Sequence, residues 1–138
     1  MATEKTILVA DDESHILHVV SLKLRNAGFA VVCAQDGREA LELAGQHRPH
    51  LVITDYHMPQ LSGLELCRRL KQDPATAGIP AIMLTARGYN LEPHDTQQSG
   101  ILRMLSKPFS PRHLLATVNE VLDQAATATD GGTWRGAA

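Results

Sequence analysis

The sequence has few cysteines, few aromatic residues and no long apolar run. Cys33 and Cys67 lack the close spacing of metal ligands, so we expect two buried or half-buried thiols. No apolar run approaches the length that spans a membrane, and residues 1–5 lack the pattern of a signal peptide. These absences exclude a membrane span on the sequence pattern and predict a cytoplasmic location.

Neither sign of charge dominates the chain. Lysine and arginine number 13 against 15 acidic residues, and the net charge of −2 gives no electrostatic case for direct nucleic-acid binding. A length of 138 residues with 43% hydrophobic content suits one globular domain with its own core. We place that domain at residues 1–126. The small and polar residues over 127–138 predict a flexible tail or linker.

Short apolar runs alternate along the chain with segments of helical periodicity. The first four runs show little polar alternation, which is typical of strands covered on both faces. Strands are predicted over residues 6–10, 29–34, 51–54, 81–85 and 101–105, and helices over 13–27, 36–46, 62–72 and from Ser110 onward. The polar segment 89–99 contains Pro93, so the fourth helix is expected to be short or irregular. This order predicts an α/β fold with a parallel sheet.

Three carboxylates, a hydroxyl and an ammonium group fall at the carboxyl ends of the predicted strands. Each alone has a simpler explanation as a helix cap, a strand end or a solvated charge. The group consists of Asp11 and Asp12, Asp55, Thr85 and Lys107. Ligands of open parallel sheets bind at this edge, and clustered carboxylates repel one another unless a cation lies among them. The joint pattern predicts a metal-assisted site.

The residue types at this edge suit phosphoryl transfer. Mg²⁺ prefers oxygen ligands and commonly binds one or two carboxylates together with phosphate. An aspartate can accept a phosphoryl group as a nucleophile, and this chemistry mainly requires positioning and charge neutralisation. Lys107 would supply neutralisation and Thr85 a hydrogen bond to the new phosphoryl oxygen.

The motifs resemble those of the receiver domain of two-component response regulators, over roughly residues 5–125. They are Val9-Ala10-Asp11-Asp12, Val52-Ile53-Thr54-Asp55-Tyr56-His57-Met58-Pro59, Leu84-Thr85-Ala86 and Lys107-Pro108-Phe109. The resemblance implies a flavodoxin-like, doubly wound (βα)5 three-layer sandwich with strand order 2-1-3-4-5. It implies that Asp55 is the phosphoacceptor, served by a sensor histidine kinase or a phosphotransfer protein in a reaction that uses Mg²⁺ (or Mn²⁺).

The resemblance also assigns a role to each of the other site residues. Asp12 would bind Mg²⁺ directly, Asp11 would act through water, and Asp55 and the backbone carbonyl of His57 would complete the protein ligands. Thr85 would be the switch hydroxyl and Lys107 would contact the phosphoryl group. The Lys107–Pro108 peptide bond would be cis.

The chain departs from the family pattern near its predicted output surface. Met104 stands where receivers commonly carry Tyr or Phe, and Ile101 stands where they usually carry a small residue. With Pro93, these residues suggest that phosphorylation is read through an unusual surface or is weakly transmitted. His57 and Arg87 flank the site and are expected to tune autodephosphorylation. A solvent-facing polar pair is the alternative interpretation.

We therefore expect a signalling domain that catalyses only its own phosphoryl transfer and hydrolysis. It would control a downstream protein or an output domain, either alone or within a longer regulator. The sequence does not decide whether it forms a homodimer. Alternatives are a weakly switching interaction or phosphate-sink module, and an aspartate-nucleophile phosphatase, which would need a second acid where His57 stands. A flavin carrier would need a phosphate-binding loop after the first strand, where this chain has acids.

Overall fold

The fold was analysed in a computed structural model, which describes residues 5–85 and 99–134, with side chains described up to residue 125. The helix predicted within 89–99 and the site residue Arg87 therefore lie outside the described residues, apart from Ser99. In the described part of the chain, no helix is both long enough and apolar enough to cross a membrane.

Five parallel strands form a single sheet in the order β2-β1-β3-β4-β5. This confirms the predicted fold class and strand order. The strands are β1 (Thr6–Ala10), β2 (Ala30–Ala34), β3 (Leu51–Asp55), β4 (Ala81–Thr85) and β5 (Ile101–Ser106). The order changes direction between β1 and β3, and ligands of such sheets bind at the carboxyl ends of the strands flanking that point.

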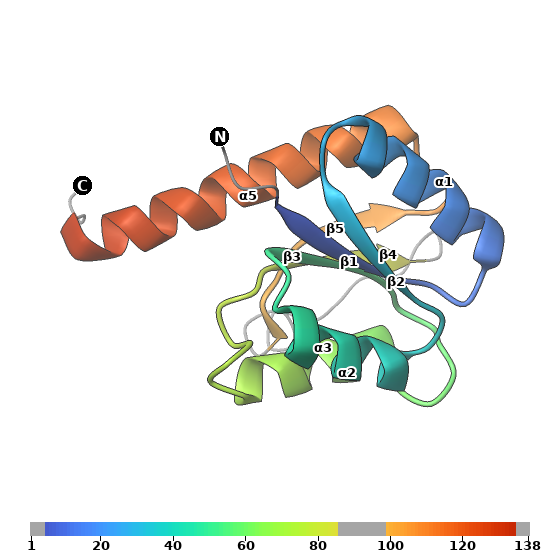
Figure 1. Cartoon of the computed structure of the whole chain (residues 1–138), viewed down its shortest axis with the longest axis horizontal. Coiled ribbons are helices and arrows are strands. Elements are labelled where there is room, and N and C mark those ends of the chain that lie inside the picture. Colours follow the sequence, from blue (N-terminus) through green and yellow to red (C-terminus); the bar gives the residue numbers. More distant parts are fainter. Residues whose placement is uncertain (1–4, 86–98, 135–138) are drawn as a thin grey trace.

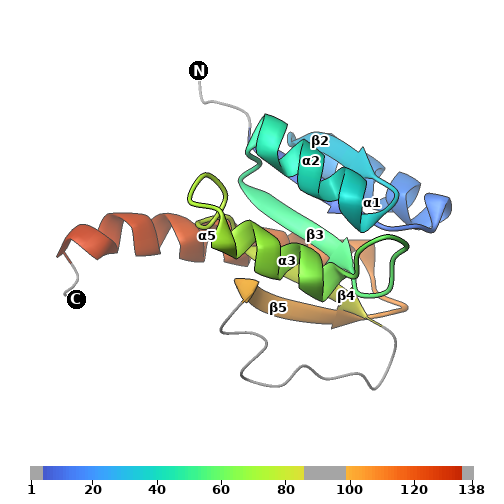
Figure 2. The same cartoon turned by 90° about the horizontal axis from the view of Figure 1, so that it is seen from below.

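Four helices in the described residues cover the two faces of the sheet. They are α1 (Ser14–Asn26), α2 (Gly37–His47), α3 (Gly63–Gln72) and α5 (Pro111–Trp134). Helices α1 and α5 lie on one face and α2 and α3 on the other (Figures 1 and 2). Alternate strand residues face the two layers: Ile7 packs in the core beneath α1 and α5, and Leu8 packs beneath α2 and α3. Burial on both sides explains the continuous apolar runs.

Local signals in the sequence set several helix ends. The Asp36 carboxylate accepts a 2.8 Å hydrogen bond from the Glu39 N–H and caps α2, and Ser62 caps α3 through the Glu65 N–H at 3.1 Å. Helix α1 ends in a Schellman motif, because the Phe29 N–H donates to the Leu24 carbonyl. Gly28 supplies the left-handed residue of that motif, with φ of +101°.

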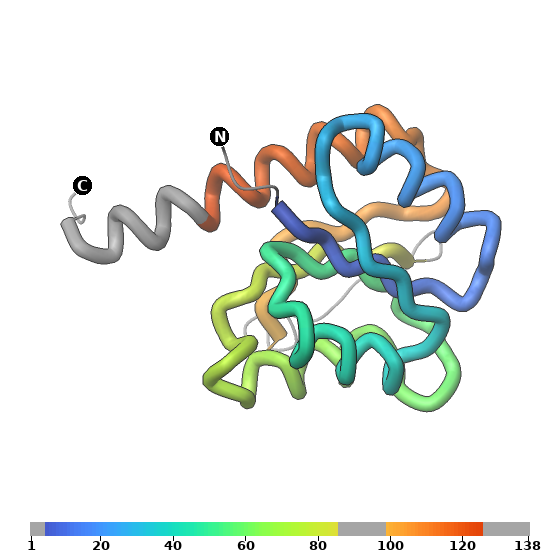
Figure 3. The backbone as a smooth tube through the Cα atoms, viewed as in Figure 1, coloured from blue at the N-terminus to red at the C-terminus, as the bar shows by residue number. Residues whose placement is uncertain are grey.

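The last helix extends further than the sequence analysis predicted. Helix α5 runs to Trp134, so residues 127–134 are helical, and the flexible tail or linker over 127–138 stays a prediction. The prediction rested on the small and polar residues of this segment, and such a composition is a weak guide to where a helix ends because no proline interrupts the segment. Its C-terminal part extends beyond the edge of the sheet (Figure 1). Figure 3 shows the path of the backbone through the sheet and helices to the coloured part of α5. The domain boundary at residue 126 stays a prediction.

Candidate functional site

The predicted carboxylates converge where β1 and β3 end side by side. Ala10 pairs with Thr54 in the parallel ladder, so the residues that follow, Asp11 and Asp55, are neighbours across the two strands. Asp11 is fully buried, Asp55 is 7% exposed and Asp12 is exposed to solvent. Ligand oxygens of Asp11, Asp12 and Asp55 lie within 4.8 Å of one another.

Backbone interactions hold these acids in place. The Asp11 N–H donates to the Ala34 carbonyl at 3.1 Å, and an Asp11 carboxylate oxygen accepts the Glu13 N–H at 2.9 Å. The second bond turns the chain from β1 into α1. On the β3 side, the Asp55 carbonyl accepts the Thr54 hydroxyl at 3.0 Å and lies directly against Gly63, where a Cβ atom would overlap it.

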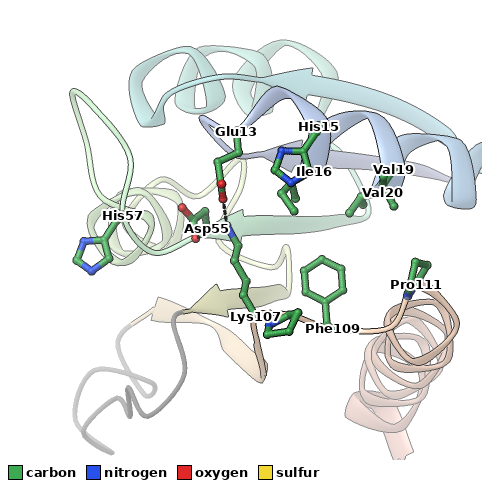
Figure 4. Close-up of a pocket in the computed structure, with 11 residues that line it drawn as sticks. Glu13, His15, Ile16, Val19, Val20, Asp55, His57, Lys107, Phe109 and Pro111 are labelled. Carbon is green, nitrogen blue, oxygen red and sulfur yellow. Dashed lines mark hydrogen bonds and ion pairs between the residues drawn. The ribbon is translucent and has the colours of Figure 1, made fainter.

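Lys107 reaches the carboxylates from the end of β5. Its Nζ atom lies 3.1 Å from Asp11 Oδ2, 3.2 Å from Asp55 Oδ1 and 2.9 Å from Glu13 Oε1. The Lys107 N–H donates to the Thr85 carbonyl at 2.8 Å, which aligns the ends of β4 and β5. The Lys107–Pro108 peptide bond is cis, the isomer that the sequence resemblance implies. Figure 4 shows the lysine side chain extending toward Asp55 and Glu13.

The electrostatics of the site are dominated by burial and by crowded negative charge. Burial raises the pKa of the Asp55 carboxyl, with a further contribution from the Asp11 carboxylate, and Lys107 opposes both effects. Burial likewise raises the pKa of Asp11. Burial acts to lower the pKa of Lys107, but hydrogen bonds to Glu13 and Asp11 and the nearby charges raise it above its ordinary value.

The residues present fit a hard divalent cation. The cluster of Asp11, Asp12 and Asp55 holds three carboxylates, and the single ammonium group of Lys107 is shared by Asp11, Asp55 and Glu13, so the site carries excess negative charge. Carboxylate oxygens are the ligands that Mg²⁺ prefers, and the exposed Asp12 leaves room for the waters that this ion retains. The His57 carbonyl as a further ligand stays a prediction.

The other predicted residues lie around this centre. Thr85 is buried at the end of β4. His57 is exposed, its ring makes an edge contact with Tyr56 at 4.7 Å, and its side chain points away from Asp55 (Figure 4). Met104 is half-buried and packs against the apolar cluster beneath α2 and α3, while Ile101 is fully part of that cluster.

A pocket of about 540 Å³ opens beside Asp55, between α1 and the loop that leads to α5. Its polar end holds Asp55, Lys107 and Glu13, and the rest is largely apolar. The lining residues are Glu13, His15, Ile16, Val19, Val20, Asp55, His57, Lys107, Pro108, Phe109 and Pro111. Neither this pocket nor the contact of Glu13 with Lys107 was predicted from the sequence. The sequence signal for Glu13 is an acid directly after Asp11 and Asp12, at the start of the predicted helix over 13–27.

Known proteins are similar to this chain in sequence and in fold. The family model of the response regulator receiver domain matches residues 7–119. The phosphate regulon transcriptional regulatory protein PhoB of Pseudomonas aeruginosa is 39% identical over 86% of this chain and 52% of its own length. The DNA-binding dual master transcriptional regulator RpaA of Synechocystis is 39% identical over 84% of this chain and 48% of its own length. The chain therefore spans about half the length of these curated relatives.

The solved structure of a single receiver domain matches this chain over nearly its whole length. The chemotaxis response regulator CheY4 of Vibrio cholerae superposes with a TM-score of 0.80 at 34% identity, covering 86% of this chain and 99% of that one. The family match covers most of the chain, and the strand order and the acidic edge of the sheet agree with it. This chain belongs to the response regulator receiver domain family and is a receiver domain of a two-component response regulator.

Proposed function

We propose that Asp55 accepts a phosphoryl group from a phosphohistidine of a sensor histidine kinase or phosphotransfer protein, in a reaction that requires Mg²⁺ (or Mn²⁺). One observation carries the proposal: the nearly buried Asp55 carboxylate clusters with Asp11 and Asp12 and lies 3.2 Å from Lys107 Nζ. That set combines a nucleophile, a cation site and a fixed positive charge, which are the parts that phosphoryl transfer needs.

The chemistry divides among these residues. An Asp55 oxygen attacks phosphorus, the bond from phosphorus to the histidine nitrogen breaks, and that nitrogen leaves with the electron pair. The metal, held by Asp12, Asp11 and Asp55, would offset negative charge on the phosphoryl oxygens. Lys107 provides the second positive charge from its position 3.2 Å from Asp55. The buried Thr85 at the neighbouring strand end donates a hydrogen bond to the phosphoryl group.

The apolar pocket beside Asp55 suits the docking of the phosphodonor protein. Val19 on α1 is 42% exposed and Leu22, one turn further on, is 51% exposed, although both are apolar. Val19 and Phe109 both line the pocket and present an apolar surface beside the acidic centre. A helix carrying the phosphohistidine would cover this surface and bring its phosphoryl group to Asp55.

The phosphorylated domain would then control a protein target or an output domain rather than a small-molecule substrate. A second candidate, a weakly switching receiver that acts mainly as a phosphate sink, is favoured by one observation. Met104 is packed against the core cluster at the position where the family commonly has an aromatic ring, and it lacks the flat ring that reports two states.

Incubation with acetyl phosphate and Mg²⁺, followed by intact mass measurement, tests the proposal. We expect the gain of one phosphoryl group, lost when Mg²⁺ is chelated and absent in Asp55→Asn. The Glu42→Gln variant, altered on the exposed surface of α2, is the control and should be phosphorylated normally. An unmodified wild-type protein, or modification that persists in Asp55→Asn, would refute the proposal.

A further inference from the structure

Glu13 makes the shortest contact with the Lys107 ammonium, although it stands outside the carboxylate cluster that fits a metal. Its Oε1 atom lies 2.9 Å from Lys107 Nζ, compared with 3.1 Å for Asp11 and 3.2 Å for Asp55. Among the described residues, the acids whose ligand oxygens lie close enough together to hold an ion are Asp11, Asp12 and Asp55. Glu13 therefore contacts the lysine without belonging to the metal cluster.

Two of the three contacts are hydrogen bonds that Lys107 donates, to Asp11 at 3.1 Å and to Glu13 at 2.9 Å, and the contact with Asp55 is an ion pair at 3.2 Å. An ammonium group has three N–H donors and no acceptor. Two of the acceptors, Asp11 and Glu13, belong to one turn, which is closed by the 2.9 Å hydrogen bond from the Glu13 N–H to Asp11. The Glu13 carbonyl also accepts the N–H groups of Ile16 and Leu17, so its backbone is fixed at the start of α1. The third partner of the ammonium group is Asp55.

A bound divalent cation would change which of these contacts remain. It would draw oxygens of Asp11 and Asp55 toward itself and weaken their attraction for the ammonium group. Glu13 is the acceptor that keeps its full charge for Lys107 under those conditions. Without it, the long and flexible lysine side chain would be held by shared oxygens alone and would sample more rotamers.

We propose that Glu13 is a positioning residue that holds the Lys107 ammonium beside Asp55, ready for the negative charge that arrives with the phosphoryl group. The proposal rests on the proposed phosphoacceptor function. In this arrangement Glu13 and Asp11 anchor two N–H groups, and the third N–H group passes from the Asp55 carboxylate to a phosphoryl oxygen. Glu13 itself touches neither the metal nor the phosphoryl group.

The charge of Glu13 has a second effect of opposite sign, and a double-mutant cycle separates the two. A carboxylate near the site repels an anionic phosphodonor, so removing its charge would speed phosphorylation by that route. Positioning acts only through Lys107, whereas repulsion does not need the lysine. The cycle therefore compares Glu13→Gln in the wild-type and Lys107→Ala backgrounds.

The first measurement is the rate of phosphorylation by acetyl phosphate at saturating Mg²⁺. We expect Glu13→Gln to slow it by about two- to fivefold, the range for a half-exposed ion pair. In the Lys107→Ala background the same substitution should cause no slowing. Glu42→Gln on α2 is the matched control and should leave the rate unchanged. Because relief of repulsion acts equally in both backgrounds, the decisive quantity is the difference between them. A change of the rate by the same factor in both backgrounds would overturn the proposal.

The second measurement observes the lysine directly and needs no phosphorylation. With ¹⁵N-labelled lysine, the held Lys107 ammonium should give a distinct NMR signal in both metal-free and Mg²⁺-loaded protein. Glu13→Gln should broaden or shift this signal, most strongly with Mg²⁺, and Glu42→Gln should not. An unchanged signal in Glu13→Gln would overturn the proposal. If the wild-type protein accepts no phosphate but the signal responds, the phosphoacceptor function fails and the positioning contact stands.

Discussion

Asp55 and Asp11 occupy positions where the surroundings oppose their charge. Both are almost completely removed from water, and burial raises the pKa of each carboxyl. A carboxyl whose pKa is raised on folding stabilises the protein fully at pH values below its unfolded pKa. That contribution is lost as the pH rises through the raised folded pKa. At neutral pH the ionised acids therefore destabilise the metal-free fold, which is a common feature of functional sites.

Removing the charge of Asp55 should stabilise the metal-free protein. We expect Asp55→Asn to raise the free energy of unfolding at pH 7 by about 0.5–2 kcal/mol, the range common for single stabilising substitutions. The advantage should shrink as the pH falls toward the ordinary carboxyl pKa, because wild-type Asp55 then becomes neutral as well. Urea unfolding in the presence of a chelator at both pH values measures the difference. An Asn variant that is less stable than wild type at pH 7 would contradict this account.

Most of the site residues can be predicted from sequence because each is local to a strand end. Asp11, Asp55 and Thr85 directly follow or close an apolar run, so a parallel sheet brings them to one edge whatever the loops do. The contact between Glu13 and Lys107 could not be predicted in this way. It joins residues 94 positions apart and depends on how closely the end of β5 approaches the start of α1.

At the scale of elements, the loop from β3 to α3 decides where Asp55 stands. Gly63 opens α3 directly against the Asp55 carbonyl, and its N–H donates to the Tyr56 carbonyl at 2.8 Å. Its backbone has no positive φ, so an alanine would suit the helix itself. The nearest atoms to an added Cβ are the backbone carbonyl of Asp55, which cannot move aside as a flexible side chain could, and the Thr54 hydroxyl at 3.1 Å.

Gly63→Ala should therefore destabilise the fold and disturb Asp55. We expect a loss of about 1–3 kcal/mol, as for other overpacked core positions, together with slower phosphorylation. Gly45→Ala is the matched control, because Gly45 lies inside α2 with open space around its Cβ position. That variant should be more stable than wild type by up to about 1 kcal/mol. Thermal unfolding of both variants checks the contrast, and equal effects of the two substitutions would exclude the packing explanation.

The ends of the helices and strands are harder to predict from sequence patterns than their presence. Strands β1 and β4 match the predicted ranges, which are short and mostly apolar runs. Helix α5 does not, because it continues past residue 126 through threonine and glycine residues, whose weak helix propensity disfavours a helix without forbidding one.

For the whole molecule, the proposed cation site at the acidic edge would tie the stability of the domain to a bound cation. The cluster joins β1 to β3, and Lys107 links it to β5, so the site forms only when these strands are assembled. A ligand that binds only the folded state stabilises it by an amount set by its concentration relative to Kd. Mg²⁺ should therefore act as a folding ligand for the entire sheet.

We expect Mg²⁺ at ten times its Kd to stabilise the wild-type protein by about 1.4 kcal/mol, seen as a rise of a few degrees in Tm. Asp12→Ala should lose most of this response, because Asp12 is the exposed member of the cluster and has room for the ion. Its metal-free stability should change little, since surface substitutions typically stay within about 0.5 kcal/mol. Glu42→Gln on α2 controls for general charge screening and should keep the full rise. A full Mg²⁺ response in Asp12→Ala would mean that the ion stabilises the domain from somewhere other than this edge of the sheet.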